Sequence, residues 1–374
     1  MSVQELLTQK RLCVCVGAGG VGKTTTAAAI AIGLAATGRR VALVTIDPSR
    51  RLAGALELDR LSNEPQRLTD AHLAPTGIDL AGGELWAMVL DPKQTFDELV
   101  TRLAPDPQTR DRVFANHIYR ELSGAVGGSH EFTAIAKLYA LDQERTYDAI
   151  VLDTPPSRDT LEFLRAPQRL IQFFDTRALR LLLTPAGFGA RLASHAGAPA
   201  LSLLRRLVGV DLLAEISLFL AAMGGLIGGF RERASAVEAL LHDPACTFIL
   251  VSSPEQEPVR EAIDFAAQLR DAGLTPGALI VNRVHGTEDA EGDPQAVQAA
   301  LTGPLGERLA AAVGASVADA TARASFDRRG VERLRRDLSE LPQTLIPQFD
   351  APLGDLAMLG EVARRLFVLP GSAA

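Results

Sequence analysis

Cysteine is scarce in this sequence, and none of the structures that cysteines usually build is indicated. The three cysteines, Cys13, Cys15 and Cys246, are odd in number and all lie in apolar runs. We interpret them as buried thiols in a reducing compartment, not as a disulfide framework. The six histidines are scattered without metal-ligand spacing, so no zinc site is expected. These features predict a cytoplasmic protein.

The sequence also lacks a basic surplus, a signal peptide and a long apolar run. A net charge of −7 leaves no positive surplus to neutralise phosphates, which argues against nucleic acid as the main partner. The N-terminal segment MSVQELLTQKR has no apolar core of signal-peptide length. Residues 216–230 carry no charge, but these 15 residues fall short of the roughly 20 that span a bilayer. We therefore expect no integral membrane span.

Strand-like and helix-like segments alternate along the chain. Continuous apolar runs with helical spacers predict an α/β fold with a mainly parallel, doubly wound sheet flanked by helices. Residues 161–242 have helix-like order without a strand, and residues 294–338 form a second helical stretch. We expect a single domain over residues 1–374 with a helical insertion subdomain at 161–242. The predicted strands are residues 12–16, 41–46, 85–90, 149–152, 247–251 and 278–281.

The segment between the first predicted strand and helix carries the most specific motif. It runs GAGGVGKT from Gly17 to Thr24 and satisfies G-x-x-x-x-G-K-[ST]. In such a loop backbone N–H groups surround phosphate oxygens, Lys23 reaches the β- and γ-phosphates, and the Thr24 hydroxyl ligates magnesium. The N-terminus of the following helix adds partial positive charge. The expected ligand is a nucleoside triphosphate with Mg²⁺, bound by Gly19, Gly20, Val21, Gly22, Lys23, Thr24 and Thr25.

Two acids follow predicted strands, where a parallel sheet presents its functional groups. Asp153 ends the apolar strand that precedes it, which is the pattern of a Walker B carboxylate that holds magnesium. Asp47 directly follows the strand at residues 41–46. The alternative for either residue alone is an ordinary acid that begins a loop. Together with the phosphate-binding loop they indicate a nucleotide hydrolase.

Three longer motifs extend this pattern: GAGGVGKTT, then TIDPSRRLAGAL from Thr45, then VLDTPPSRDTLEFLRAP from Val151. In these segments the chain resembles the ArsA-type ATPases, which comprise arsenite-efflux ATPases and the eukaryotic ATPases that target tail-anchored membrane proteins. The resemblance covers nearly the whole chain, and the third motif, the family's switch II, is the most specific. It implies a P-loop ATPase of the deviant Walker A type, which binds ATP with Mg²⁺.

The resemblance also implies roles for individual residues. Asp47 matches the acid that orients the attacking water, and Asp153 matches the magnesium carboxylate of switch II. Asn282, in ALIVNRV, matches the asparagine that contacts adenine. The segment from Pro347 to Asp350, with Pro347 and Phe349 as candidate contacts, matches the loop that closes over the base.

The departures from the family pattern bear on the rate of ATP hydrolysis that we expect for this chain. Ala18 stands where the family has a signature lysine that reaches the partner subunit's nucleotide, so slow hydrolysis is expected, because a trans-acting cation is worth roughly 10³- to 10⁵-fold. Arg158-Asp159 replaces the family's Gly-His. Arg158 is either a substitute cation or a surface arginine in a local ion pair. There is no CxxC for a dimer-stapling zinc and no recognisable arsenite cysteine trio.

The sequence leaves open which partners the protein binds and what its ATP hydrolysis drives. The leading interpretation is a dimeric ATPase whose switch movement acts on a partner protein or hydrophobic client, with residues 216–230 as candidate apolar surface or as a core helix. The dimer is either a homodimer or a heterodimer with a paralogue that carries the signature lysine. The alternatives are an ATP-binding scaffold subunit and a Min- or partition-type ATPase on membrane or DNA. The amphipathic helix expected at 354–367 has two cations, Arg364 and Arg365, so we expect it to dock onto the sheet.

Overall fold

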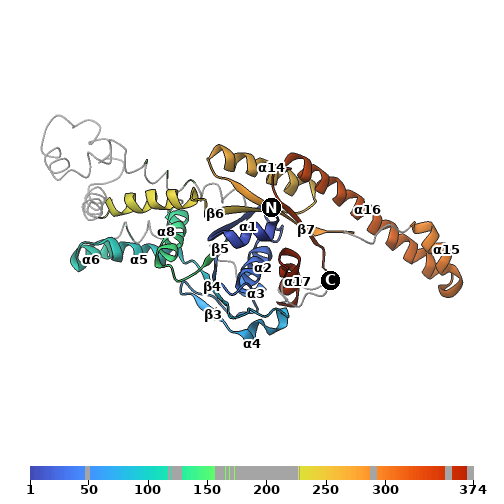
Figure 1. Ribbon diagram of the computed structural model, residues 1–374, viewed down its shortest axis with the longest axis horizontal. Coiled ribbons are helices and arrows are strands. Elements are labelled where there is room, and N and C mark those ends of the chain that lie inside the picture. The colour runs from blue at the N-terminus through green and yellow to red at the C-terminus, as the bar shows by residue number, and fades with distance from the viewer. Residues whose placement is uncertain are drawn as a thin grey trace, which may run out of the picture. The chain divides into compact units, whose positions relative to one another are not determined.

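Strands and helices alternate along the chain as the apolar runs predict, and they build two compact units (Figure 1). Unit 1 combines Met1–Val89, Thr146–Thr160 and Pro244–Ala374, and unit 2 combines Leu90–Arg145 and Leu161–Asp243. The computed structural model describes residues 1–46, 51–116, 119, 129–155, 165, 168, 172, 226, 228–286, 293–349 and 356–368.

Unit 1 contains one eight-stranded sheet with the strand order β3-β4-β2-β5-β1-β6-β7-β8. All neighbouring strands are parallel except β3, which pairs antiparallel with β4 at one edge. The six predicted strands are confirmed to within a few residues. The strands are β1 Leu12–Gly17, β2 Arg40–Thr45, β3 Gln66–Leu68, β4 Glu84–Val89, β5 Ala149–Asp153, β6 Cys246–Ser252, β7 Pro276–Val284 and β8 Gln343–Pro347.

The two strands that the sequence did not predict, β3 and β8, form the edges of the sheet. β3 has three residues, of which two are exposed, and most of β8 is only half-buried. An edge strand has a neighbouring strand on one side only and is more open to solvent, so it does not require the continuous apolar run that marks a central strand. The sequence pattern therefore favours the six inner strands.

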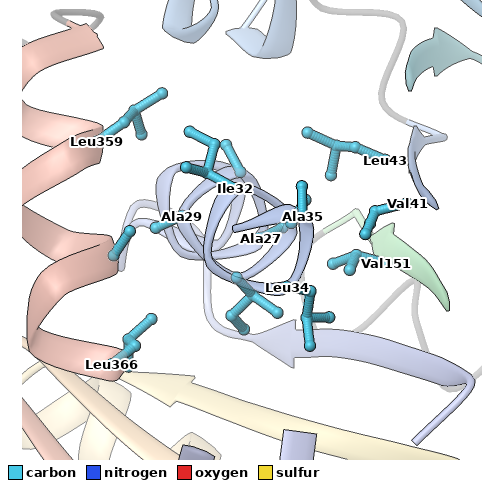
Figure 2. Close-up of a cluster of buried hydrophobic side chains, with 14 of the residues drawn as sticks. Ala27, Ala29, Ile32, Leu34, Ala35, Val41, Leu43, Val151, Leu359 and Leu366 are labelled. Carbon is cyan, nitrogen blue, oxygen red and sulfur yellow. The ribbon is translucent and has the colours of Figure 1, made fainter. Parts of the chain in front are cut away.

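One face of the sheet is covered by α2, Lys23–Ala35, and the helix α17, Leu356–Leu366, packs on the outside of α2. Figure 2 shows α2 between strand residues such as Leu43 and Val151 and the α17 side chains Leu359 and Leu366. α2 is rich in alanine, whose small side chain permits close approach on both sides. This layer is the main hydrophobic core of unit 1.

The C-terminal amphipathic helix is confirmed, and its contact with the sheet is the smaller part of its packing. Its apolar residues, including Leu359 and Leu366, are buried mainly against α2 and the short 3-10 helix Ala74–Thr76, with a smaller contact to β8. Burial of a leucine side chain contributes roughly 1.5–3 kcal/mol, so this apolar stripe is an integral part of the core. α2 lies over β1, β5 and β2 because it connects β1 to β2, which flank β5 in the sheet.

The opposite face of the sheet carries α14, Gln256–Asp271, and α14 contacts α16 (Figure 1). The helical stretch predicted at 294–338 is confirmed as two helices, α15 Pro294–Leu305 and α16 Glu307–Asp337, which join at Gly306 and pack on each other. The other α-helices in the described part of unit 1 are short: α1 Val3–Gln9, α3 Arg51–Ala55 and α4 Asp70–Leu73. No helix in the described ranges is long and apolar enough to cross a membrane.

Unit 2 is helical wherever its regular structure is described. It contains α5 Pro92–Leu103, α6 Pro107–Ala115 and α8 Ser129–Glu144, and residues 228–241 form a further helix. The Phe96 ring lies 5.8 Å from that of Tyr119 and 5.5 Å from that of Phe230, measured between centroids. The unit takes in the range 161–242 and also 90–145, which the sequence pattern did not assign to it. Phe230 is buried, while most of 216–230 lies outside the described residues.

Candidate nucleotide-binding site

The phosphate-binding loop lies where the sequence predicts, between β1 and α2. β1 ends at Gly17, and α2 begins at Lys23 with Gly22 as its N-cap residue. Because β1 is a central strand, the loop lies at the carboxyl edge of the sheet, next to the ends of β5 and β6. Gly19 and Gly20 are exposed, and Thr25 is half-buried on the first turn of α2. The helix N-terminus and the loop amides together form an anion-binding geometry.

Asn282 from β7 supports this loop. Its Nδ2 donates a hydrogen bond to the carbonyl oxygen of Val21 at 2.9 Å. Gly22 has a φ of +94°, and a Cβ placed there would lie 2.2 Å from the same Nδ2. Glycine is therefore required at position 22 both for its backbone conformation and for the close approach of Asn282. This contact joins the phosphate-binding loop to β7.

Lys23 turns back into the loop that precedes it. Its Nζ donates a hydrogen bond to the carbonyl oxygen of Ala18 at 2.7 Å, and the side chain is buried. A buried ammonium group requires such acceptors, because the cost of removing a charge from water is large. The loop thus holds the lysine charge at its centre, where phosphate oxygens are expected.

Ala18, which the resemblance predicts to stand in place of a signature lysine, packs inside the chain. The residue is 6% exposed and forms a small apolar cluster with Val21 and Val251. An alanine fits this place, whereas a lysine stem would have to leave the cluster to bring its charge into water. The packing was not foreseen from the sequence, because Val251 is distant along the chain.

Asp153 lies at the end of β5 beside the start of α2. Its Oδ2 accepts hydrogen bonds from the Thr24 hydroxyl at 2.8 Å and from the Thr45 hydroxyl at 3.1 Å. The residue is 1% exposed. A carboxylate and a hydroxyl oxygen in contact are hard ligands of the kind that Mg²⁺ prefers. The two predicted metal-site residues, Thr24 and Asp153, are therefore brought together.

The buried carboxylate also affects the neighbouring strand. Burial raises the pKa of the Cys15 thiol well above its usual value, and the Asp153 charge raises it further. Burial likewise raises the pKa of Cys13 from 9.0 to about 12. All three cysteines are free and buried, which confirms that part of the sequence interpretation. Neither Cys13 nor Cys15 is a reactive thiolate at neutral pH.

Several predicted site residues have limited or no description. Pro347 ends β8, and Phe349 packs against the hydrophobic core near this edge of the sheet. Asp47, Arg158, Asp159 and Asp350 lie outside the described residues. Their assigned roles therefore rest on the sequence.

Thr45 is the site residue that the sequence pattern did not reveal. It ends β2, and its backbone is the register partner of Asp153 on β5. The signal was present, since a hydroxyl closes an otherwise apolar run VALVT two residues before Asp47. A threonine in a strand is usually unremarkable, so only the pairing of β2 with β5 gives it significance.

Comparison with known proteins agrees with this geometry. The model of the family described as anion-transporting ATPase matches residues 10–301. The chain is 28% identical to ATPase get3 of Aspergillus terreus over 289 residues, which cover 76% of each protein. It is 27% identical to ATPase GET3A of Arabidopsis thaliana over 295 residues, 78% of this chain and 72% of that one. The family match spans both the phosphate-binding loop and the strand that ends at Asp153, so the chain belongs to the anion-transporting ATPase family and is a P-loop ATPase.

Proposed function

We propose that this protein hydrolyses ATP in a magnesium-dependent cycle whose output is a conformational change. The observation that carries the proposal is the 2.8 Å hydrogen bond between the Thr24 hydroxyl and Asp153 Oδ2. It joins the helix that follows the phosphate-binding loop to the strand that precedes switch II. A metal site at this junction links the state of the nucleotide to the switch segment, as in other P-loop NTPases.

Thr24 and Asp153 are the residues that would hold Mg²⁺. Both oxygens suit this hard cation, and both lie at the N-terminus of α2, where phosphates bind. The ion, when bound, neutralises negative charge that develops on the phosphate oxygens. Lys23 would exchange its hydrogen bond to the Ala18 carbonyl for one to a phosphate oxygen and so add a second positive charge. The loop amides and the glycines at 19, 20 and 22 allow the close approach that this requires.

The remaining roles follow from the family resemblance. Asp47 would orient the attacking water, as a carboxylate in hydrogen-bond reach of the nucleophile does. Asn282, Pro347 and Phe349 would contact the base. The Asn282 amide is bonded to the Val21 carbonyl oxygen, so an adenine contact by the same amide requires it to reorient or to use its oxygen.

We further propose a single ATPase domain over residues 1–374 with a helical insertion subdomain at 161–242, acting in the cytoplasm as a dimer. The support is the family membership together with the resemblance to enzymes that act on tail-anchored membrane proteins. The partner subunit is a second copy or a paralogue with the signature lysine, and a hydrophobic protein is the proposed client. Movement of switch II would reach the helical residues that directly follow it in the chain.

A second candidate function is favoured by position 18. Ala18 packs against Val21 and Val251 and offers no charge to a partner's nucleotide. In this alternative the chain is an ATP-binding scaffold subunit, and a partner that carries the lysine performs most of the hydrolysis. The two candidates share the same binding site and differ in turnover by the isolated chain.

Single-turnover hydrolysis of radiolabelled ATP by the purified protein tests both candidates. The ATPase proposal expects magnesium-dependent release of phosphate by the chain alone, and Lys23→Ala should abolish it because the phosphates lose their main side-chain cation. The scaffold alternative expects ATP binding with release only after a signature-lysine paralogue is added. If the chain neither binds nor hydrolyses ATP with Mg²⁺, both candidates are rejected.

A further inference from the structure

One oxygen of Asp153 accepts two hydroxyl groups from two different elements. Thr24 approaches from α2, and Thr45 approaches from the end of β2 at 3.1 Å. The parallel pairing of β2 with β5 places Thr45 and Asp153 in register. Neighbouring register partners point to the same face of a sheet, so the contact follows directly from the strand order. Thr45 is 2% exposed and thus shielded from competing water.

A buried carboxylate with few donors is costly, and each charge-assisted hydrogen bond offsets part of that cost. Two donors at one oxygen also fix the rotation of the carboxyl plane. When Thr24 turns its oxygen towards a metal ion, the Thr45 hydroxyl stays as a donor to Asp153. The orientation of Asp153 would then depend on Thr45.

We propose that Thr45 is a positioning residue of the magnesium site and acts through Asp153. This inference rests on the proposed function in one respect, namely that Asp153 is a magnesium ligand. Outer-shell partners of metal ligands are worth about 10- to 100-fold in metal affinity. Thr45 would belong to this class, since its hydroxyl donates a hydrogen bond to Asp153, the proposed ligand.

The end of β2 is tied to Asp153 by its backbone as well. The Ile46 N–H donates to the carbonyl oxygen of Asp153 at 3.3 Å. Asp47 follows immediately in the sequence. Asp153 and the start of the segment that carries Asp47 are therefore joined by two hydrogen bonds, one from the Thr45 hydroxyl to the carboxylate and one from the Ile46 N–H to the backbone carbonyl oxygen of Asp153.

The test uses Thr45→Val, which removes the hydroxyl and keeps the branched shape, and Thr45→Ser, which keeps the hydroxyl. Thr247→Val is the matched control, because Thr247 is another buried threonine of the same sheet, on β6. Mn²⁺ binding to the full-length protein with ATP is measured by electron paramagnetic resonance. Thr45→Val should weaken Mn²⁺ binding about 10- to 100-fold. Thr45→Ser and Thr247→Val should stay within about threefold of the wild type, because they retain the donor to Asp153.

A second measurement separates positioning from general damage to the loop. ATP affinity is determined in EDTA, where no metal is bound. If Thr45 acts through the metal carboxylate, Thr45→Val should bind metal-free ATP like the wild type. Equal losses with and without metal, an effect of Thr45→Ser as large as that of Thr45→Val, or unchanged Mn²⁺ binding in Thr45→Val would each overturn the inference.

Failure of the proposed function gives a different result. If the wild type does not hydrolyse ATP, the turnover proposal fails, while the Mn²⁺ titrations of the variants still decide the role of Thr45. If Asp153→Asn leaves Mn²⁺ binding unchanged, Asp153 is not a ligand and the inference about Thr45 falls with it.

Discussion

The contact between Gly22 and Asn282 makes the phosphate-binding loop sensitive to a single methyl group. Gly22 has a φ of +94°, and an added Cβ would lie 2.2 Å from Asn282 Nδ2. Gly22→Ala must therefore displace the Asn282 amide from the Val21 carbonyl oxygen, to which it donates at 2.9 Å. The substitution combines backbone strain with the loss of a buried hydrogen bond.

The magnitude follows from these two contributions. A non-glycine residue in the left-handed region costs roughly 1–2 kcal/mol, and a buried amide left without its acceptor costs about 1–3 kcal/mol. Gly22→Ala should thus lower the free energy of unfolding by about 2–5 kcal/mol. Asn282→Ala alone removes one hydrogen bond, about 0.5–1.5 kcal/mol. In the double variant the methyl group meets no amide, so the two effects should fall short of additivity by about 1–3 kcal/mol.

Urea unfolding followed by tryptophan fluorescence measures this coupling. Trp86, on β4, is the single tryptophan of the sequence and lies in the same unit as the site. Gly20→Ala is the matched control, because Gly20 also has a positive φ, +80°, but nothing lies within 4 Å of the place that its added methyl group would take. Gly20→Ala should cost only the strain and add to Asn282→Ala within about 0.5 kcal/mol. Additive behaviour of Gly22→Ala with Asn282→Ala would refute the proposed contact.

Four further predictions concern the site and the core. Asp153→Asn should raise the Mg²⁺ concentration for half-maximal turnover at least about tenfold, and an unshifted magnesium titration would count against Asp153 as a ligand. Asp47→Asn should retain ATP binding and slow single-turnover hydrolysis about 10²- to 10⁴-fold; loss of binding with normal turnover of bound ATP would make Asp47 structural. Ala18→Lys should raise turnover at least about tenfold in a dimer with two facing sites. If Arg158 already supplies the charge, turnover should stay unchanged in Ala18→Lys and fall strongly in Arg158→Ala. Cys13 should resist alkylation in the native protein, and rapid labelling of the native protein detected by mass spectrometry would contradict this. Because burial raises the pKa of the Cys13 thiol from 9.0 to about 12, the stability that the neutral thiol contributes is complete below pH 9 and is lost between pH 9 and 12.

The sequence alone was enough to predict the inner part of the sheet and the phosphate-binding loop. A continuous apolar run such as that of β1 or β6 is required only where both faces of a strand are buried. The loop motif is local, because its glycines, Lys23 and Thr24 act through the conformation of eight consecutive residues. Asp153 was found for the same reason, since it directly ends an apolar strand. A feature that consecutive residues form by themselves can therefore be predicted from the sequence.

The strand order, and with it the contacts of the site, was decided by the tertiary structure. β5 lies between β1 and β2, so Asp153 meets Thr24 from α2, the helix that follows β1, and Thr45 from the end of β2. β7 brings Asn282 to the loop, where it occupies the space that Gly22 leaves free. The residues of each pair are more than a hundred positions apart, and no periodicity links them. Their proximity arises only when the sheet forms.

Two of the features that sequence reasoning left incomplete, the packing of the C-terminal helix and that of Ala18, have a common physical cause. The C-terminal helix was expected to be amphipathic, but an apolar stripe does not specify its partner, and the helix packs mostly on α2 and the 3-10 helix Ala74–Thr76, with a smaller contact to β8. Ala18 was recognised as a departure from the family, but its packing against Val21 and Val251 depends on the neighbouring strand β6. The sequence thus determined which side chains are apolar, flexible or charged. Packing determined which surfaces and hydrogen-bond donors these side chains meet, because burial and hydrogen bonding act between elements that are distant along the chain.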